Sequence, residues 1–241
     1  MKLVLNNNKQ FKQVFEVISN ITDEIRIECD TDGLRLRALS RSHIEYVSLD
    51  LKSRFFDEYA CETPETICLD IMEFNKVLKR CKNEDRLIMG TDDSNLVLTF
   101  EGDSTRVFHV RLIDLEYDTP NAPVLELPVT LNIDTSVLVD MLDDAVLFSE
   151  SARFDVDGDY LYCRGEGGFG DTVSKYVHGE RVVDSVGSMF NIGSLKSMLR
   201  MSSICDDVSM SLGDDNPLFL TFDIGDGVLE FMLAPRVGDG S

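Results

Sequence analysis

Apolar residues recur at the spacing of a single helix face in four short segments of the chain. The segments around Phe11, Phe74 and Leu138 each place apolar residues at i, i+3, i+4 and i+7, and a weaker fourth case begins at Leu195. In a helix of 3.6 residues per turn, this spacing gathers the apolar side chains on one side. The sequence therefore predicts four amphipathic helices, each with one buried face.

Between these helical segments, apolar and polar residues alternate. The alternation runs over residues 24–30, 34–39 and 44–51, which is typical of strands with one buried face. The dipeptides at 32–33 and 157–158 are both Asp-Gly, a pair that favours tight hairpin turns. Mostly antiparallel sheet is the expected partner of the four helices.

The two halves of the chain share one plan. Residues 96–101 (LVLTFE) match residues 218–223 (LFLTFD), and each segment is followed by a turn and another strand-like run. Pro120, Pro123 and Pro128 interrupt any regular structure near the middle, because proline fixes φ and removes a hydrogen-bond donor. An internal repeat predicts an α+β fold of two similar domains, each with two short helices on one face of its sheet. The expected boundaries are 1–111 and 129–237 for the two domains, 112–128 for an interdomain connector and 238–241 for a tail.

Charge and cysteine usage narrow the function. Acidic residues outnumber basic ones 44 to 23, a net charge of -21, which by itself argues against contact with nucleic acid. The sequence shows neither a secretion-signal pattern nor an apolar run of membrane-spanning length, so we expect no membrane partner. The six cysteines are scattered without a C-x-x-C pair, which favours reduced thiols over a metal site.

The positive charge is not spread evenly. An ideal helix advances about 100° per residue, and on that geometry three of the four predicted helices place Lys or Arg opposite or beside their apolar stripes. Such faces suit phosphate contacts that read no base sequence, although a solvated helix face would also be polar. The candidate phosphate-contacting residues are Lys9, Lys12, Lys76, Lys79, Arg80, Lys196 and Arg200.

Two motifs suggest chemistry but lack its context. Residues 165–170 (GEGGFG) match G-x-G-x-x-G, yet no helix and no kinase lysine or aspartate motif follows, so a hairpin loop is the better interpretation. Acidic residues at 155, 157, 159 and 166 have calcium-loop spacing, but Tyr160 occupies the position that requires glycine. None of the three histidines has a nucleophile and a carboxylate at recognisable spacing. We therefore predict no catalytic residue, no cofactor and no metal.

Four motifs in order resemble the proliferating cell nuclear antigen family of DNA sliding clamps. Residues 32–44 (DGLRLRALSRSHI) are similar to that family's D-G-hydrophobic segment ending in S-H-V/I, and 75–79 (NKVLK) to its second helix. Residues 112–115 (LIDL) resemble the start of its connector, and 233–236 (LAPR) its carboxy-terminal motif. The resemblance runs from Met1 to about Val237. The length and the ending look more archaeal than eukaryotic.

The resemblance implies a non-enzymatic processivity factor for DNA replication and repair. It implies a homotrimeric ring that encircles double-stranded DNA without sequence preference, with helices lining the hole. Lys12, Lys76, Lys79 and Arg200 correspond to basic positions of that channel. A clamp loader of the replication factor C type would open the ring. The protein itself would act in the cytoplasm near the nucleoid if it is archaeal, or in the nucleus if it is eukaryotic. The third helix departs from the pattern, because its polar face carries Asp140, Asp143 and Asp144.

The resemblance also implies two kinds of protein contact. A pocket would receive the short hydrophobic motif called the PIP box, carried by partners such as DNA polymerase, flap endonuclease and DNA ligase. Its residues would be Leu39, Ser40, His43, Ile44, Tyr117, Pro120, Ala122, Pro217, Met232, Leu233, Ala234 and Pro235. Subunits would meet edge to edge, through Val107, Phe108, His109, Val110 and Arg111 on one side and Thr172, Val173, Ser174, Lys175, Tyr176 and Val177 on the other. Arg106 and Arg111 would add ion pairs there.

Two alternatives remain at this point. A subunit of a heterotrimeric or checkpoint-type clamp would share the fold but would not assemble with itself. An enzyme built on the glycine segment 165–170 would instead bind a nucleotide.

Overall fold

Antiparallel strands form the framework of the chain, and their alternating residues supply its core. The structure is a computed structural model that describes all residues except 116–118, 122–123, 181, 183–184 and 237–241. The chain divides into two units, one of residues 1–122 with 223–229 and the other of residues 123–222 with 230–241.

The first unit contains two groups of strands. One sheet has the order β5-β1-β7-β8-β9, formed by Glu58–Ala60, Lys2–Leu5, Arg86–Thr91, Asn95–Glu101 and Thr105–Arg111. The other group has the order β4-β3-β2-β6, formed by Glu45–Lys52, Gly33–Leu39, Glu24–Cys29 and Glu65–Asp70. A short 3-10 turn, η1 (Ser53–Phe55), follows β4.

The second unit repeats this arrangement. One sheet has the order β13-β12-β11-β14, formed by Gly170–Val177, Tyr160–Gly167, Ser151–Asp157 and Val186–Asn191. Strands β10 (Val129–Asp134), β15 (Asp207–Leu212) and β16 (Leu218–Asp223) pair in that order. Strand β17 (Gly227–Leu233) follows β16, and its residues from 230 onward belong to the second unit. Strand β8 and strand β16 coincide with the two copies of the internal repeat.

The four helices lie where the apolar spacing predicts them. They are α1 (Lys9–Ile18), α2 (Ile71–Leu78), α3 (Thr135–Ala145) and α4 (Ile192–Met198), and a 3-10 turn, η2 (Leu199–Ser203), extends α4. Three of them begin at an acidic or amide side chain that ends the preceding strand. Asp70, Asp134 and Asn191 each accept a hydrogen bond from a backbone N–H of the first turn, at 2.8–3.0 Å.

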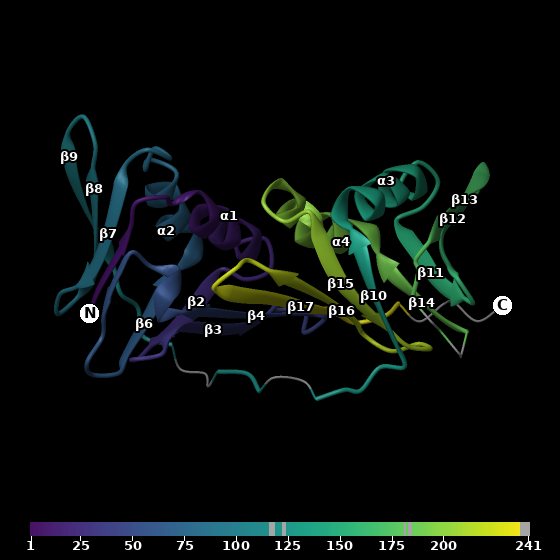
Figure 1. The fold of residues 1–241 in the computed structure, drawn as a ribbon, viewed down its shortest axis with the longest axis horizontal. Helices are drawn as coiled ribbons and strands as arrows, with labels where there is room; N and C mark the ends of the chain where they lie inside the picture. Colours follow the sequence, from purple (N-terminus) through teal and green to yellow (C-terminus); the bar gives the residue numbers. More distant parts are fainter. Residues whose placement is uncertain (116–118, 122–123, 181, 183–184, 237–241) are drawn as a thin grey trace. The chain divides into compact units, whose positions relative to one another are not determined.

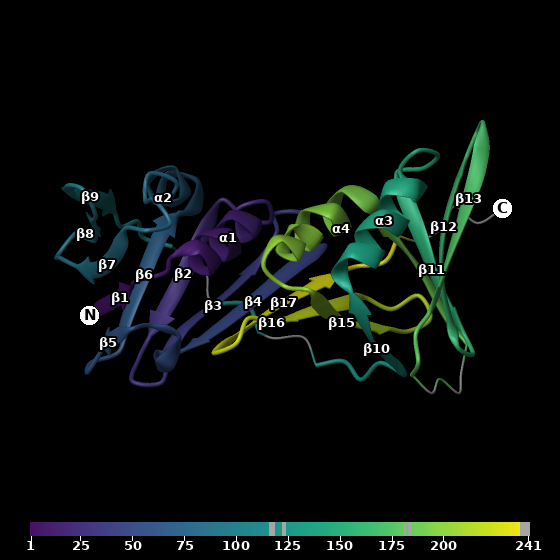
Figure 2. The same cartoon turned by 45° about the horizontal axis from the view of Figure 1, so that its top comes forward.

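In the first unit, helices α1 and α2 lie side by side on one face of the strands (Figures 1 and 2). The rings of Phe15 and Phe74 meet edge to face with centroids 5.2 Å apart, and the Asn75 amide donates to the Phe15 carbonyl at 2.9 Å. Because these contacts use the apolar stripes, the lysines of both helices remain on the outer side. Within the described ranges, no helix has the length and apolarity that a membrane span requires.

The glycine-rich segment forms the tight hairpin between β12 and β13. Gly167 and Gly170 are paired, so that only Gly168 and Phe169 form the loop. Gly165 is buried against the last residue of α3, because a Cβ there would lie 2.7 Å from the Ala145 carbonyl oxygen. The glycines of this motif therefore serve packing and the hairpin turn, as the hairpin interpretation predicts.

Candidate functional site

The outer face of α1 and α2 carries a cluster of basic side chains. Lys12 donates to the Cys81 carbonyl and to the Asn83 amide oxygen, both at 2.7 Å, so its position is fixed. Lys79 lies 3.3 Å from the Glu16 carboxylate. A groove of about 220 Å³ between the two helices is lined by Lys9, Lys12 and Lys79. These side chains form a cationic surface that is already held in place.

Lys76 and Arg80 extend this surface along α2. The hydrogen bond between Lys76 and Glu73 raises the pKa of the lysine, so it stays charged at any physiological pH. Arg80 is exposed, and its carbonyl accepts a hydrogen bond from the Arg106 guanidinium at 2.9 Å. The structure thus brings all five predicted basic residues of the first unit onto one helical layer.

The helical layer of the second unit is different. Lys196 of α4 forms an ion pair with Asp143 of α3, so part of the predicted basic face is neutralised within the unit. Asp144 accepts a hydrogen bond from the Ser174 hydroxyl at 3.1 Å, and Asp140 is exposed. Arg200 lies exposed in η2. Phosphate contacts would therefore be weaker here than on α1 and α2.

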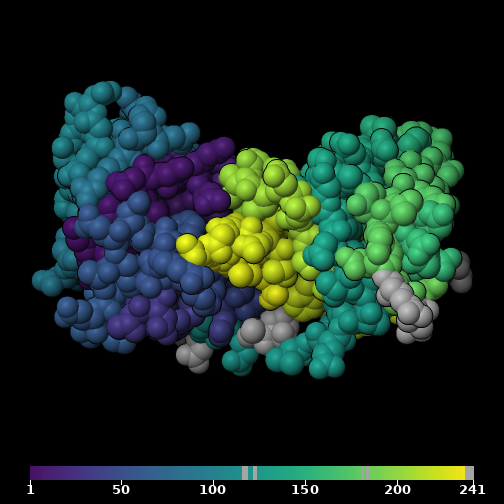
Figure 3. Space-filling view, viewed as in Figure 1, coloured from purple at the N-terminus to yellow at the C-terminus, as the bar shows by residue number. Residues whose placement is uncertain are grey.

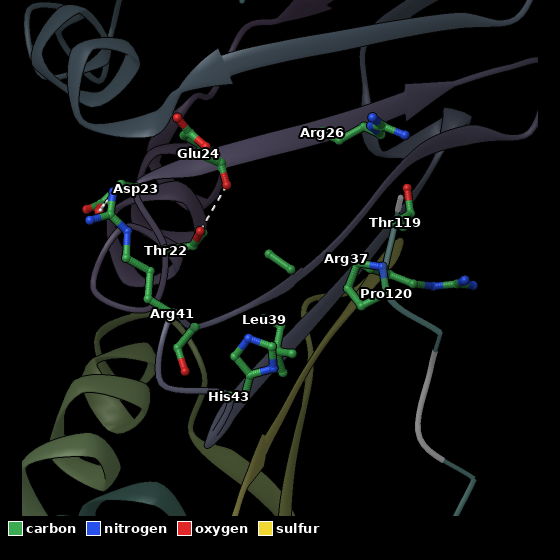
Figure 4. Close-up of a pocket in the computed structure, with 12 residues that line it drawn as sticks. Thr22, Asp23, Glu24, Arg26, Arg37, Leu39, Arg41, His43, Thr119 and Pro120 are labelled. Carbon is green, nitrogen blue, oxygen red and sulfur yellow. Dashed lines mark hydrogen bonds and ion pairs between the residues drawn. The ribbon is translucent and has the colours of Figure 1, made fainter. Parts of the chain in front are cut away.

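A pocket of about 470 Å³ lies in the first unit beside the end of β3 (Figure 4). Of the predicted docking residues, it brings together Leu39, Ser40, His43 and Pro120. Ile44 is 42% exposed next to it without lining it. An apolar recess with polar groups at its margin suits a short hydrophobic motif of a partner protein.

The loop between β3 and β4 gives the pocket its shape. The Ser40 carbonyl accepts from the His43 N–H at 2.9 Å, and the Ser40 N–H donates to the Glu45 carbonyl at 2.8 Å. These bonds close a tight turn in which His43 has a φ of +60°, a left-handed conformation that side-chain-bearing residues rarely adopt. The imidazole is therefore held over the pocket by the backbone rather than by its own contacts.

The structure does not place the other seven predicted docking residues along this pocket of the first unit, for two reasons. Tyr117 and Ala122 lie outside the described residues. The remaining five belong to the second unit, where Leu233 is buried and the others are partly exposed: Pro217, Met232, Ala234 and Pro235.

Sequence reasoning missed several charged residues of the pocket. Arg26, Arg37 and Arg41 line it together with Asp23 and Glu24. The only available signal was the strand alternation, which places Arg26 and Arg37 on the polar faces of two neighbouring strands. Which of those positions faces a pocket depends on the path of the connector, and this is not a local property of the sequence.

Strand β9 is the edge of its sheet in the first unit, because it pairs with β8 alone. Figure 3 shows the teal residues of this part of the chain at the outer rim of the first unit. Val107 is 52% exposed, and Val110 is buried. Arg106 was expected to pair across subunits, but its guanidinium binds the nearly buried Asp85 of its own unit.

Strand β13 is the corresponding edge in the second unit, because it pairs with β12 alone. Its outward residues include Val173 and Val177, which are 49% and 62% exposed, and Phe169 at the hairpin tip is 80% exposed. The Lys175 ammonium lies 3.4 Å from the centroid of the Tyr160 ring. A strand edge with exposed apolar side chains favours pairing with another chain.

The acidic and cysteine residues weighed for metal binding were located in the structure. No cluster of three or more His, Cys, Asp or Glu side chains among them could hold a metal. Asp155, the first of the four acidic residues with calcium-loop spacing, forms ion pairs with Arg153 and Arg164 at 2.8 and 3.1 Å. Burial raises the pKa of the Cys163 thiol to about 12, so this cysteine is an inert core residue.

Comparison with solved structures defines the class of the protein. PCNA from Thermococcus kodakaraensis superposes with a TM-score of 0.91 at 25% identity, covering 98% of this chain and 99% of that one. Proliferating cellular nuclear antigen from Entamoeba histolytica gives a TM-score of 0.90 at 22% identity, covering 98% of both chains. The repeated units and these similarities define the DNA-clamp fold and confirm the predicted α+β architecture.

Sequence comparison gives the family. Residues 1–121 match the family described as "Proliferating cell nuclear antigen, N-terminal domain". The chain is 44% identical to a DNA polymerase sliding clamp of Methanobrevibacter smithii and 42% identical to that of Methanothermobacter thermautotrophicus, with 98% of each chain covered. The chain therefore belongs to the proliferating cell nuclear antigen family of sliding clamps, and the relatives compared by sequence are archaeal. Members of this family are processivity factors without catalytic activity, so the protein is not an enzyme.

Proposed function

We propose that this protein is a homotrimeric ring that encircles double-stranded DNA and holds replication and repair proteins on it. The two open sheet edges carry this proposal. One unit ends in the unpaired edge of β9 and the other in that of β13. Two different edges on one chain allow head-to-tail pairing of identical subunits, which gives a closed ring when the rotation between subunits permits it.

The proposed domains are 1–111 and 129–237, joined by the connector 112–128. In the ring, the helices would face the DNA. The basic layer of α1 and α2 supports this orientation, because lysines act as point charges toward phosphates and read no base sequence. The chain as a whole has a net charge of -21, and its acidic remainder would face away from DNA.

The pocket beside β3 is the proposed docking site for partner proteins. A partner segment with aliphatic and aromatic anchors would fill the recess lined by Leu39, His43 and Pro120. DNA polymerase, flap endonuclease and DNA ligase are the proposed partners, and a loader of the replication factor C type would open the ring. The proposed place of action is the nucleoid of an archaeal cell.

Native mass spectrometry tests the assembly. A species near three times 27.1 kDa is expected for the homotrimer. A monomer that persists at micromolar concentration would favour the heterotrimeric alternative instead.

Retention on DNA tests the topology. After loading onto nicked circular DNA, the ring should stay bound in high salt and should be released when the DNA is linearised. Retention that survives linearisation would contradict a sliding ring, because a ring held only by topology leaves through a free end.

A further inference from the structure

Two neighbouring arginines in the pocket beside β3 have no carboxylate partner among the described residues. Arg26 of β2 and Arg37 of β3 each lie one residue beyond the cross-strand pair of Ile27 and Leu36. Both line the pocket, and Figure 4 places both on the side formed by Thr119 and Pro120. Like charges at facing positions weaken an antiparallel strand pair. An anion bound between the two arginines would reduce the repulsion between their positive charges.

The contacts of the two side chains agree with this interpretation. The Arg26 Nη2 atom donates to the Leu115 carbonyl at 3.1 Å, but its buried Nε atom has no hydrogen-bond acceptor among the described residues. Arg37 is exposed and forms no hydrogen bond or ion pair with another described residue. A buried N–H of a charged group normally has a partner. The pair therefore offers unused donors to a ligand.

The third arginine of the pocket, Arg41, differs from the other two because it has a carboxylate partner. Arg41 lies on the opposite side of the pocket, 2.9 Å from the Asp23 carboxylate, and Glu24 lies on that side as well (Figure 4). Both carboxylates of the pocket are thus gathered away from Arg26 and Arg37. One end of the pocket holds two carboxylates and one arginine, and the other end holds two arginines.

We propose that Arg26 and Arg37 bind an acidic side chain of the docking segment, so that the pocket prefers partners with Asp or Glu beside their hydrophobic anchors. This rests on the proposed docking function. Guanidinium groups bind carboxylates through paired, charge-assisted hydrogen bonds, which add orientation as well as attraction. The preference is local, because the net charge of -21 repels acidic segments elsewhere on the surface.

Binding of three synthetic peptides to the full chain tests the proposal. The peptides share the same aliphatic and aromatic anchors and carry Glu, Gln or Lys at the positions on either side of them. We expect the Glu peptide to bind about three- to tenfold more tightly than the Gln peptide at low salt, with the difference shrinking at high salt.

Three variants locate the effect. Arg37→Gln should reduce the difference between the Glu and Gln peptides to less than about twofold, and Arg37→Glu should reverse the preference toward the Lys peptide. Arg41→Gln is the matched control, since it removes an arginine of the same pocket that already has a carboxylate partner. The Glu preference should survive this control.

The possible results separate this inference from the docking function. Equal binding of all three peptides that is lost in Leu39→Ala would keep the docking site and overturn the acidic preference. A Glu preference that Arg37→Gln leaves intact would also overturn it. Binding of no peptide would refute docking at this pocket, and the preference with it.

Discussion

The packing of α3 against the glycines of β12 leads to a prediction that can be worked out in detail. Gly165 has no room for a side chain, because its Cβ would lie 2.7 Å from the oxygen and 2.9 Å from the Cα of Ala145. Ordinary contact begins at 3.4 Å, so the substitution Gly165→Ala requires a shift of about 0.7 Å between α3 and β12. Both obstructing atoms are backbone, and no side-chain rotation relieves the clash.

The matched control is three residues away in the same hairpin. A Cβ at Gly168 would meet nothing within 4 Å, and neither glycine has the positive φ that alanine avoids. Both substitutions reduce the backbone entropy of the unfolded chain by the same amount, so this contribution cancels in the comparison. What remains is the overpacking at Gly165, about 1–3 kcal/mol.

Thermal unfolding of both variants, at one protein concentration, measures the difference. For about 2 kcal/mol, the melting temperature of Gly165→Ala should lie about 4–8 °C below that of Gly168→Ala. Equal stabilities would refute the reasoning, because they would mean that α3 is not held tightly against β12.

Three further predictions concern charge and burial. Lys76→Gln with Lys79→Gln should lower the salt-dependence slope of DNA binding by about two without changing the native mass, and loss of the trimer would instead make these lysines structural. Arg106→Gln should destabilise the chain by about 3 kcal/mol in calorimetry, because it leaves Asp85, which is 2% exposed, without its cation; an unchanged melting temperature would contradict this. Iodoacetamide at pH 8 should modify the half-exposed Cys68 and spare Cys163, since a pKa of about 12 leaves almost no thiolate at that pH; labelling of Cys163 in native protein would count against its burial.

The acidic third helix changes the expected distribution of DNA contacts around the proposed ring. Lys196 pairs with Asp143 beside two further aspartates of α3, whereas the five basic residues of the α1 and α2 layer outnumber their partners Glu16 and Glu73. The sequence placed all these residues on polar helix faces, but it could not pair residues that lie 53 positions apart. Their pairing depends on how α3 and α4 pack against each other.

The sequence by itself determined the local elements and the repeated plan. The four helices, the alternating strands and the hairpin at residues 165–170 follow from periodicity and turn residues, because each element buries one face wherever it is placed. The sequence motifs also indicated the sliding-clamp family, and the comparisons with known proteins confirm that family.

Only the tertiary structure decided which residues meet. Strand order left β9 and β13 as open edges. The register of β2 and β3 placed Arg26 and Arg37 one residue beyond the pair of Ile27 and Leu36, although neither arginine has a sequence motif. Folding also placed the Arg106 guanidinium on the Asp85 carboxylate, 21 positions away in the sequence. Such contacts join residues distant in sequence, and they depend on the sum of many packing choices, while periodicity reports only the face that each element buries.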